Sequence, residues 1–373
     1  MQTRAAVLFE SPGHWEVTRV ELDEPQPGEV LVQLAAAGLC HSDDHATTGD
    51  RRPAILPVCG GHEGSGIVRA VGQGVTDVAE GDHVVTSFVP ACGVCEPCAA
   101  GTQHLCDEGK HMPSGFMRDG TYRMHMPDGR DVAQTAATGT FSEWQVMGQR
   151  SVVKVPEDLP LDVVALVSCG VPTGWGSATT AAGISVGDVV IVMGCGGIGI
   201  NAVQGAAHMG AAHVVAVDPA PLKREVSQKL GATEAFGDIA EATEFVRGVT
   251  NGQGAHAAIV TTGVCTGEHI GQAFSAIRKA GTVVVTGLGS YLETTIPLNI
   301  GELTLYQKRI QGCLYGNGSP RLQIPRLLSL YRNGILKLDE LITRRYNLEQ
   351  LNDGYADMRA GRNIRGIIDF NTL

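Results

Sequence analysis

The glycine run at 194–199, with the sequence GCGGIG, constrains the fold of this chain more than any other feature. It fits the G-x-G-x-x-G pattern, follows the apolar run Val189–Met193 and precedes an Ala-rich stretch, 200–209, with helical character. In a strand–turn–helix context the glycines allow a tight turn, close backbone approach to a pyrophosphate and close packing of helix on strand. We therefore predict a dinucleotide-binding turn rather than a merely structural one. Its residues are Gly194, Gly196, Gly197, Ile198 and Gly199.

Strand and helix patterns alternate after this turn. The apolar runs 213–218, 257–261 and 281–286 are strand-like, and 222–230 reads as a helix between the first two. Such alternation predicts an α/β domain with a doubly wound parallel sheet.

Asp218 ends the second strand of this series, 24 residues after Gly194. A carboxylate near this spacing accepts hydrogen bonds from the adenosine ribose and repels a 2′-phosphate, so we predict NAD rather than NADP. A strand-end Asp without a ligand is the structural alternative.

The first 170 residues have a different pattern, with short β-runs such as 29–34 and 66–71 separated by Gly, Pro and Asp turns. They predict a β-rich, barrel-like domain. Residues 106–140 show no clear periodicity and read as a long loop. We expect a domain at 1–171, a dinucleotide-binding domain at 172–315, and a segment 316–373, with a helix at 321–331 and a strand at 366–370, that packs back on the first.

Bulk properties exclude several classes of protein. With 373 residues the chain suits two domains, and a net charge of -11 argues against nucleic acid or an anionic membrane surface as a partner. The N-terminal residues lack the pattern of a signal peptide, and no window supplies about 18 uninterrupted apolar residues. The cytoplasm is therefore the expected compartment, where clustered cysteines more often bind metal than form disulfides.

Four cysteines fall within fifteen residues, in the pattern C-x2-C-x2-C-x7-C. Four thiolates so close together can form a closed tetrahedral zinc site, which stabilises a loop but leaves no position open for catalysis. An iron–sulfur cluster is the alternative metal centre, and chance spacing or two disulfides are the non-metal alternatives. The four residues are Cys92, Cys95, Cys98 and Cys106.

The segments 40–45 (CHSDDH) and 61–63 (GHE) are dense in metal-ligating and proton-transferring residues. The histidines of both segments, His62 and His45, are equally compatible with structural roles. Sequence spacing alone does not bring these segments together with a third ligand.

These motifs together resemble the zinc-containing medium-chain alcohol dehydrogenase family over essentially the full chain. The glycine-rich run 61–66, followed by Gly72, is similar to the family's zinc signature. The four-cysteine cluster is similar to its structural lobe, and the turn 194–199 is similar to its coenzyme fingerprint. The resemblance implies an N-terminal GroES-like barrel domain, a Rossmann domain, two zinc ions per chain and NAD(H).

By that resemblance, Cys40, His62 and Cys169 hold a catalytic zinc, which acts as a Lewis acid in reversible hydride transfer between a small primary alcohol or aldehyde and NAD(H). Ser42 and His45 match the family's proton relay, which runs through the nicotinamide ribose.

Two carboxylates lie beside this ligand set. Asp43 matches the group that orients the metal-bound His62. Glu63 matches a carboxylate that can swing onto the metal, with a salt bridge as its alternative role.

Further positions carry over by the same resemblance. His41 stands where many relatives have a pyrophosphate-binding arginine, which implies a weaker, pH-dependent phosphate contact. The other implied cofactor contacts are Thr173 at the nicotinamide, Asp218 and Lys223 at the adenosine ribose, and Arg365 at the pyrophosphate. Phe88 and Phe141 match walls of the substrate pocket.

The chain also resembles an actinobacterial branch whose members hold NAD(H) without exchange and are reoxidised by an external electron acceptor. A homodimer or homotetramer is implied by the family.

Two alternatives remain open. One is oxidation of a thiol adduct of formaldehyde, for which Lys110, His111 and Arg118 could supply a basic pocket mouth. The other is a catalytically silent nucleotide-binding protein on the same scaffold.

Overall fold

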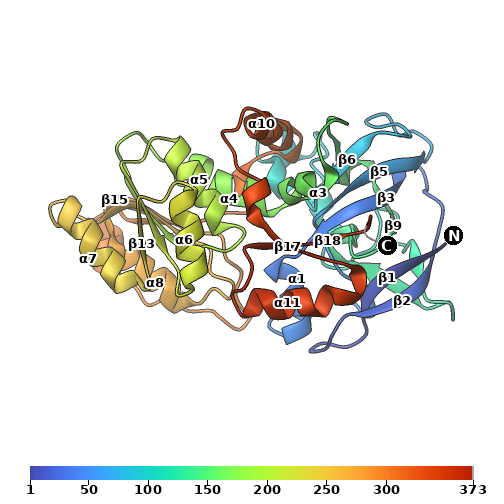
Figure 1. The fold of residues 1–373 in the computed structure, drawn as a ribbon, viewed down its shortest axis with the longest axis horizontal. Helices are drawn as coiled ribbons and strands as arrows, with labels where there is room; N and C mark the ends of the chain where they lie inside the picture. The colour runs from blue at the N-terminus through green and yellow to red at the C-terminus, as the bar shows by residue number, and fades with distance from the viewer. Residues whose placement is uncertain (372–373) are drawn as a thin grey trace. The chain divides into compact units, whose positions relative to one another are not determined.

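The computed structural model describes residues 1–371, which form two compact units (Figure 1). The first unit combines Met1–Cys169 with the C-terminal segment from Ser319, and the second is the continuous segment Gly170–Gly318. The predicted segment 316–373 includes residues 372 and 373, which lie outside the described residues. The unit that contains the N-terminus is therefore built from both ends of the chain.

Two β-layers make up the first unit. One is a closed barrel in the order β1-β2-β7-β8-β4, and the other is a seven-stranded sheet in the order β10-β6-β5-β3-β18-β17, with β9 paired to β3. The barrel strands are β1 (Gln2–Leu8), β2 (Glu16–Leu22), β4 (Val58–Cys59), β7 (Met124–His125) and β8 (Asp131–Gln134). The sheet strands are β3 (Glu29–Gly38), β5 (Gly64–Val71), β6 (His83–Thr86), β9 (Trp144–Gly148), β10 (Val152–Lys154), β17 (Ile342–Tyr346) and β18 (Arg365–Asp369).

Helices in this unit are short, apart from two near the C-terminus. The helices are α1 (His41–Thr48), α2 (Glu96–Ala99), α3 (Leu161–Val164), α10 (Pro320–Arg332) and α11 (Leu351–Arg359). Strand β18 inserts between β17 and β3, with Ile367 opposite Gly38. The C-terminal segment therefore completes the sheet from which the segments 40–45 and 61–63 emerge. The prediction of a β-rich domain that contains a barrel is confirmed.

The long segment 106–140 is only partly a loop. It contains β7 and β8, which pair with each other and close the barrel against β2 and β4. These strands have two and four residues, too few for an alternating pattern to emerge from the sequence. The prediction of a structureless loop was therefore wrong for these six residues.

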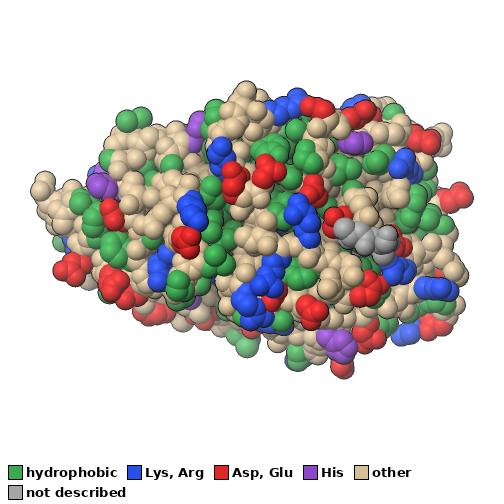
Figure 2. All heavy atoms as spheres, viewed as in Figure 1, with side chains coloured by type: hydrophobic (Ala, Val, Ile, Leu, Met, Phe, Trp, Pro, Cys, Tyr) green, Lys and Arg blue, Asp and Glu red, His purple; other side chains and the backbone are tan. Residues whose placement is uncertain are grey.

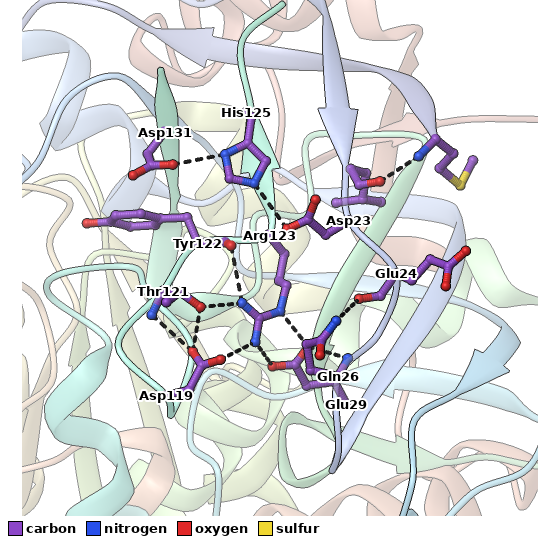
Figure 3. Close-up of polar contacts among 12 residues, drawn as sticks. Asp23, Glu24, Gln26, Glu29, Asp119, Thr121, Tyr122, Arg123, His125 and Asp131 are labelled. Carbon is purple, nitrogen blue, oxygen red and sulfur yellow. Dashed lines mark hydrogen bonds and ion pairs between the residues drawn. The ribbon is translucent and has the colours of Figure 1, made fainter. Parts of the chain in front are cut away.

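A buried ion pair ties this segment to the start of β3 (Figure 3). The Arg123 guanidinium donates to both carboxylate oxygens of Glu29 at 2.8 Å, and also to Asp119 at 2.6 Å. Only 3% of the Arg123 side chain is exposed. Nearby, the His125 ring lies between the carboxylates of Asp23 and Asp131, at 3.1 and 2.9 Å. Charge pairing thus fixes a part of the barrel that has few backbone pairs.

The second unit contains a six-stranded sheet in the order β13-β12-β11-β14-β15-β16, in which every pairing is parallel. The chain starts at the centre, moves to one edge and then returns to build the other half, so the topological switch point lies between β11 and β14. The strands are β11 (Val189–Met193), β12 (His213–Val217), β13 (Glu234–Phe236), β14 (Ala255–Val260), β15 (Ile277–Val285) and β16 (Arg309–Gly312). This is the predicted doubly wound, Rossmann-type sheet.

The helices between these strands follow from local sequence. The helices are α4 (Gly170–Gly176), α5 (Gly199–His208), α6 (Pro221–Lys229), α7 (Ile239–Val249), α8 (Gly267–Ala276) and α9 (Ile300–Leu305). Asp238 caps α7 by accepting from two backbone amides, and Thr266 forms a capping box with His269 at the start of α8. Buried Val, Ile and Ala side chains of the strands pack against these helices.

No helix within residues 1–371 is long and apolar enough to cross a bilayer. On the face shown in Figure 2, acidic and basic side chains are interspersed over the surface.

Candidate metal centres and dinucleotide turn

Four metal-ligating side chains converge in the first unit: Cys40, His62, Glu63 and Cys169. Their ligand atoms all lie within 4.8 Å of one another, and all four residues are buried. Cys40 is the residue before α1, His62 and Glu63 connect β4 to β5, and Cys169 follows the 3-10 turn Ala165–Ser168. The structure thus brings together the three ligands that the family resemblance implied, with Glu63 as a fourth group.

The imidazole of His62 is held in one orientation by Asp43. The Oδ2 atom of Asp43 lies 2.9 Å from Nδ1 of His62, which leaves Nε2 for a metal. The other carboxylate oxygen accepts a hydrogen bond from the Gly61 amide at 3.0 Å. Gly61 has a φ of +85°, and a Cβ there would lie 2.5 Å from Oγ1 of Thr140. Glycine is therefore required where the chain turns to present His62.

Glu63 is paired with Arg365 of β18, and both side chains are buried. A Cβ at position 38 would overlap the Glu63 carboxylate and lie 2.8 Å from the guanidinium, so Gly38 makes room for this pair. Burial raises the pKa of Glu63 to about 7, although the positive charge of Arg365 opposes this effect. In this conformation Glu63 makes the salt bridge that was considered as its alternative role. Arg365 also has a buried Nε that lacks a hydrogen-bond partner among the described residues.

The donor set of this cluster fits a catalytic zinc. Two sulfurs and one imidazole nitrogen occupy three positions of a tetrahedral zinc and leave the fourth open, as catalytic zinc sites require. The hydrogen bond with Cys169 and the nearby His62 lower the pKa of Cys40 well below its ordinary value, which favours the thiolate that metals bind. None of the cysteines in residues 1–371 forms a disulfide, so both sulfurs are free to ligate.

The second cluster is the four-cysteine lobe, Cys92, Cys95, Cys98 and Cys106. All four sulfurs lie within 4.8 Å of one another. The Cys92 and Cys98 sulfurs are 3.9 Å apart, as are those of Cys95 and Cys106. A tetrahedron with zinc–sulfur bonds of about 2.3 Å has edges of about 3.8 Å.

Backbone amides add to this lobe, since those of Cys92 and Cys95 donate to cluster sulfurs at 3.2 and 3.4 Å. Amide donors of this kind favour thiolates: burial alone would raise the pKa of Cys92, but the amides of Val94 and Cys95 outweigh it and help to lower this pKa to about 7. The site fits a structural zinc.

Residues of α1 lie beside the first cluster. Ser42 is exposed and its hydroxyl is 3.6 Å from the Cys40 sulfur. His45 is buried, and its ring centroid is 5.1 Å from that of His41. Phe88 packs edge-on against the His62 ring, with centroids 5.5 Å apart. Phe88 therefore borders the metal site.

Phe141 lies elsewhere. It has no exposed surface and packs in the core against Trp15 and Tyr355, with centroids 5.7 and 6.3 Å away. A side chain enclosed on all sides does not line a space that a substrate could enter. The structure therefore gives Phe141 a core position rather than the pocket wall that was expected.

The glycine turn of the second unit follows β11 and begins α5. A Cβ at Gly199 would overlap the Gly194 carbonyl, and one at Gly194 would lie 2.8 Å from the Thr262 amide. A Cβ at Gly196 would meet nothing within 4 Å among the described residues. The first and third glycines are thus required by the protein itself, whereas the second faces open space at the N-terminus of α5, as a pyrophosphate site requires.

Asp218 is buried at the end of β12 and contacts this turn directly. Its carboxylate accepts from the amides of Cys195 and Ala220 at 2.8 and 2.9 Å, and the Lys223 ammonium is 3.8 Å away. Thr173 of α4 has a buried hydroxyl for which the described chain supplies no partner. These groups fit a dinucleotide, because each carboxylate oxygen has a further lone pair for a ribose hydroxyl.

Sequence reasoning missed the partners of two predicted residues. The Arg365 contact with Glu63 joins positions 302 residues apart, which no local pattern reveals. His45 contacts Asp50, which lies only five residues further along the chain but beyond the end of α1. An acidic residue just after a helix-ending glycine was the signal that could have indicated it.

Comparisons with known proteins agree with this geometry. Residues 26–157 match the model of the alcohol dehydrogenase GroES-like domain, and residues 197–333 match that of the zinc-binding dehydrogenase. The chain is 50% identical over 368 residues to the NDMA-dependent alcohol dehydrogenase of Amycolatopsis methanolica, covering 99% of each chain. It is equally identical to the putative alcohol dehydrogenase D of Mycobacterium tuberculosis, with 99% of this chain and 100% of the relative covered. Among solved structures, benzyl alcohol dehydrogenase from Acinetobacter calcoaceticus aligns with a TM-score of 0.91 and 30% identity over 99% of both chains.

Proposed function

The chain belongs to the zinc-containing medium-chain alcohol dehydrogenase family, and from that premise we propose that it is an NAD-dependent zinc alcohol dehydrogenase. It interconverts a small primary alcohol and its aldehyde by reversible hydride transfer. The observation that carries the proposal is the buried set of two thiols and one oriented imidazole, in a chain that also has a glycine turn open to a pyrophosphate.

Each residue of the metal site has a distinct role in this proposal. Cys40, His62 and Cys169 hold the catalytic zinc, and Asp43 keeps the Nε2 atom of His62 directed at it. When bound, zinc supplies Lewis-acid polarisation of the alcohol oxygen and NAD supplies the hydride acceptor. Glu63, held by Arg365, places a carboxylate within reach of the ligand atoms.

The proton released by the alcohol is moved by residues of α1. Ser42 and His45 are three positions apart in the helix and therefore share a face. The Ser42 hydroxyl lies near the Cys40 sulfur, and His45 lies one turn further along, with an Nε2 atom that has no partner in the described chain and can accept a proton. We infer that this pair carries the proton away from the metal site.

The cofactor is held by the second unit. Gly194–Gly199 and the N-terminus of α5 bind the pyrophosphate, and Asp218 with Lys223 binds the adenosine ribose. The unpartnered hydroxyl of Thr173 contributes a contact to the nicotinamide. From the family resemblance we also infer that His41 and Arg365 contact the pyrophosphate.

We further infer that NAD(H) stays bound through the catalytic cycle and is reoxidised by a small external electron acceptor. Support comes from the 50% identity to a relative described as NDMA-dependent. Retained cofactor and exchanging cofactor differ in one measurable way, because only a retained cofactor is present in the protein after extensive dialysis.

An apolar edge of the second unit supports a homodimer. Strand β16 pairs on one side with β15, and no strand in residues 1–371 pairs on its other side. Close by in sequence, Leu292, Ile300 and Leu305 are 90%, 74% and 79% exposed. A free strand edge, like exposed large apolar side chains, is covered when two copies of a chain pair. Light scattering on the purified protein would then give twice the chain mass.

Denaturing the purified protein and identifying what it releases tests the function. We expect about two zinc ions per chain and NAD(H), together with aldehyde formation from primary alcohols when NDMA or NAD is supplied. Zinc well below two per chain would contradict the two-site assignment. Activity with formaldehyde only when a low-molecular-weight thiol is added would instead favour the adduct-oxidising alternative.

A further inference from the structure

The imidazole of His45 is enclosed by protein, with 1% of its surface exposed. Its Nδ1 atom lies 3.3 Å from the Oδ2 atom of Asp50. Its Nε2 atom is buried and has no hydrogen-bond partner within residues 1–371. The Nδ1 atom therefore contacts a carboxylate, and the Nε2 atom is left to exchange a proton.

The position of Asp50 follows from how α1 ends. Gly49 adopts a left-handed conformation, with a φ of 85°, and its amide bonds to the carbonyl of His45. This turn folds the next residue back over the last turn of the helix. The side chain of Asp50 is 36% exposed, so one carboxylate spans the enclosed ring and the solvent.

We propose that Asp50 is a positioning residue for the reaction: its carboxylate keeps the proton of neutral His45 on Nδ1, so that Nε2 is the acceptor, and it stabilises the imidazolium that forms. This inference rests on the proposed alcohol dehydrogenase function, in which His45 takes up the substrate proton.

An ionised carboxylate can only accept hydrogen bonds, so a contact with it requires a proton on Nδ1. The Thr48 hydroxyl donates to the same Oδ2 atom at 2.7 Å. That hydrogen bond, followed by the contact with His45, holds the pKa of Asp50 below its ordinary value. Asp50 is thus ionised at neutral pH and serves as an acceptor only.

The proton balance is simple. The proton from the alcohol binds to Nε2, the ring charge changes from zero to +1, and Asp50 stays ionised throughout. The imidazolium then releases the Nε2 proton to solvent, which restores the neutral ring with its proton on Nδ1. A carboxylate near an imidazolium favours the charged form, so Asp50 stabilises the His45 ring while it carries the proton.

Other charged groups around α1 are already engaged with different partners. Asp43 contacts His62, and Asp44 contacts Arg359 of α11 at 2.6 Å. The remaining titratable or charged groups near this helix are His41, Arg51 and the buried Tyr355 of α11. Of the carboxylates on this part of the described chain, Asp50 is the one that contacts the His45 ring.

The test is a nitrogen-15 NMR titration of histidine-labelled, zinc-loaded full-length protein, with the His45 signals assigned from H45Q. We expect wild-type His45 to show the Nδ1-protonated tautomer. In D50N the Nδ1 atom loses its ionised acceptor, and the neutral tautomers of His45 should become mixed. D50E should keep the wild-type tautomer. D128N is the matched control, because Asp128 pairs with Arg130 at the surface, at 2.8 Å.

Kinetics add a second readout. In D50N the plateau of the kcat/KM profile for alcohol oxidation should fall about tenfold, while the alcohol KM changes little. An Nε2-protonated tautomer in the wild-type protein would overturn the proposal without any variant. A D50N titration identical to wild type would do the same. If the wild-type protein does not oxidise alcohols but the tautomer is as expected, the enzymatic function fails and the His45–Asp50 pairing stands.

Discussion

The carboxylate of Asp43 joins two parts of the metal site, since one oxygen lies 2.9 Å from Nδ1 of His62 and the other accepts the Gly61 amide at 3.0 Å. It therefore fixes both the imidazole and the backbone turn that presents it. Groups that hold a metal-binding histidine in this way typically contribute 10–100-fold to metal affinity, as a rough range.

Replacing Asp43 by Asn should weaken zinc binding at the catalytic site by about 10–100-fold, because the amide is neutral and can present a donor to Nδ1. Competition with a chelator, followed by metal analysis, measures this loss. D128N is the control: it makes the same Asp-to-Asn change at an exposed residue that pairs with Arg130, and it should leave the zinc affinity unchanged. Equal zinc retention in D43N and wild type would show that His62 does not depend on Asp43.

Cys169→Ser and Cys98→Ser should separate the two zinc sites. C169S should lose turnover and retain about one zinc per chain, with little change in the melting temperature. C98S should also retain about one zinc, but its melting temperature should fall, because a closed four-thiolate site stabilises the lobe that contains it. Substantial alcohol oxidation by C169S would exclude Cys169 as a catalytic ligand.

Asp218→Asn should reduce the preference for NAD over NADP by roughly 10–100-fold in the ratio of dissociation constants, because a charged hydrogen-bond acceptor becomes neutral. The amide oxygen still accepts from the Cys195 backbone, which lies 2.8 Å from the wild-type carboxylate, so the glycine turn is preserved. Calorimetry on cofactor-free protein provides both constants. An unchanged preference would assign the discrimination to another residue.

Glu29→Gln should lower the free energy of unfolding, because the buried Arg123 then keeps only the carboxylate of Asp119 (Figure 3). Breaking a buried ion pair costs about 3–5 kcal/mol, and we expect a loss at the lower end of this range because Asp119 remains. Chemical denaturation measures the change in the free energy of unfolding. The control is D128N, which breaks an exposed pair with Arg130 and should cost only about 0–1 kcal/mol. Similar values for the two variants would mean that burial does not matter here.

Asp357 should make the free energy of unfolding decrease as the pH becomes acidic. A hydrogen bond from Tyr346, followed by one from Arg362, holds the pKa of Asp357 below its ordinary value. A lowered folded-state pKa means that the stabilisation is fully present above the unfolded value of about 3.9 and is lost as the pH falls through the folded value.

D357N should therefore unfold at lower denaturant concentration than wild type at pH 7, and the difference should shrink near pH 3. D353N on the exposed side of α11 is the control and should differ little from wild type at either pH. A D357N deficit that stays constant with pH would trace the effect to packing rather than to charge.

Local patterns were sufficient for part of this architecture. The glycine turn, the apolar strands around it and the four-cysteine lobe each depend on residues close together in the chain, so spacing alone indicated them. The convergence of Cys40, His62 and Cys169 required a family resemblance, because three separate loops meet only after the β-sheet has formed.

Other features could be predicted neither from local patterns nor from the family resemblance. Strands β7 and β8 are too short to show alternation, and pairing with β2 and β4 defines them. Phe141 was expected at a pocket wall, yet its position in the core depends on Trp15 and Tyr355, which come from distant parts of the chain.

The place of β18 between β17 and β3 sets an order of events during protein synthesis. The second unit, Gly170–Gly318, is one continuous segment, whereas the sheet of the first unit is complete only when residues 365–369 have been synthesised. These residues also bring Arg365 to Glu63. A chain that ends before residue 365 therefore lacks both an inner strand of the first unit's sheet and the buried countercharge of Glu63.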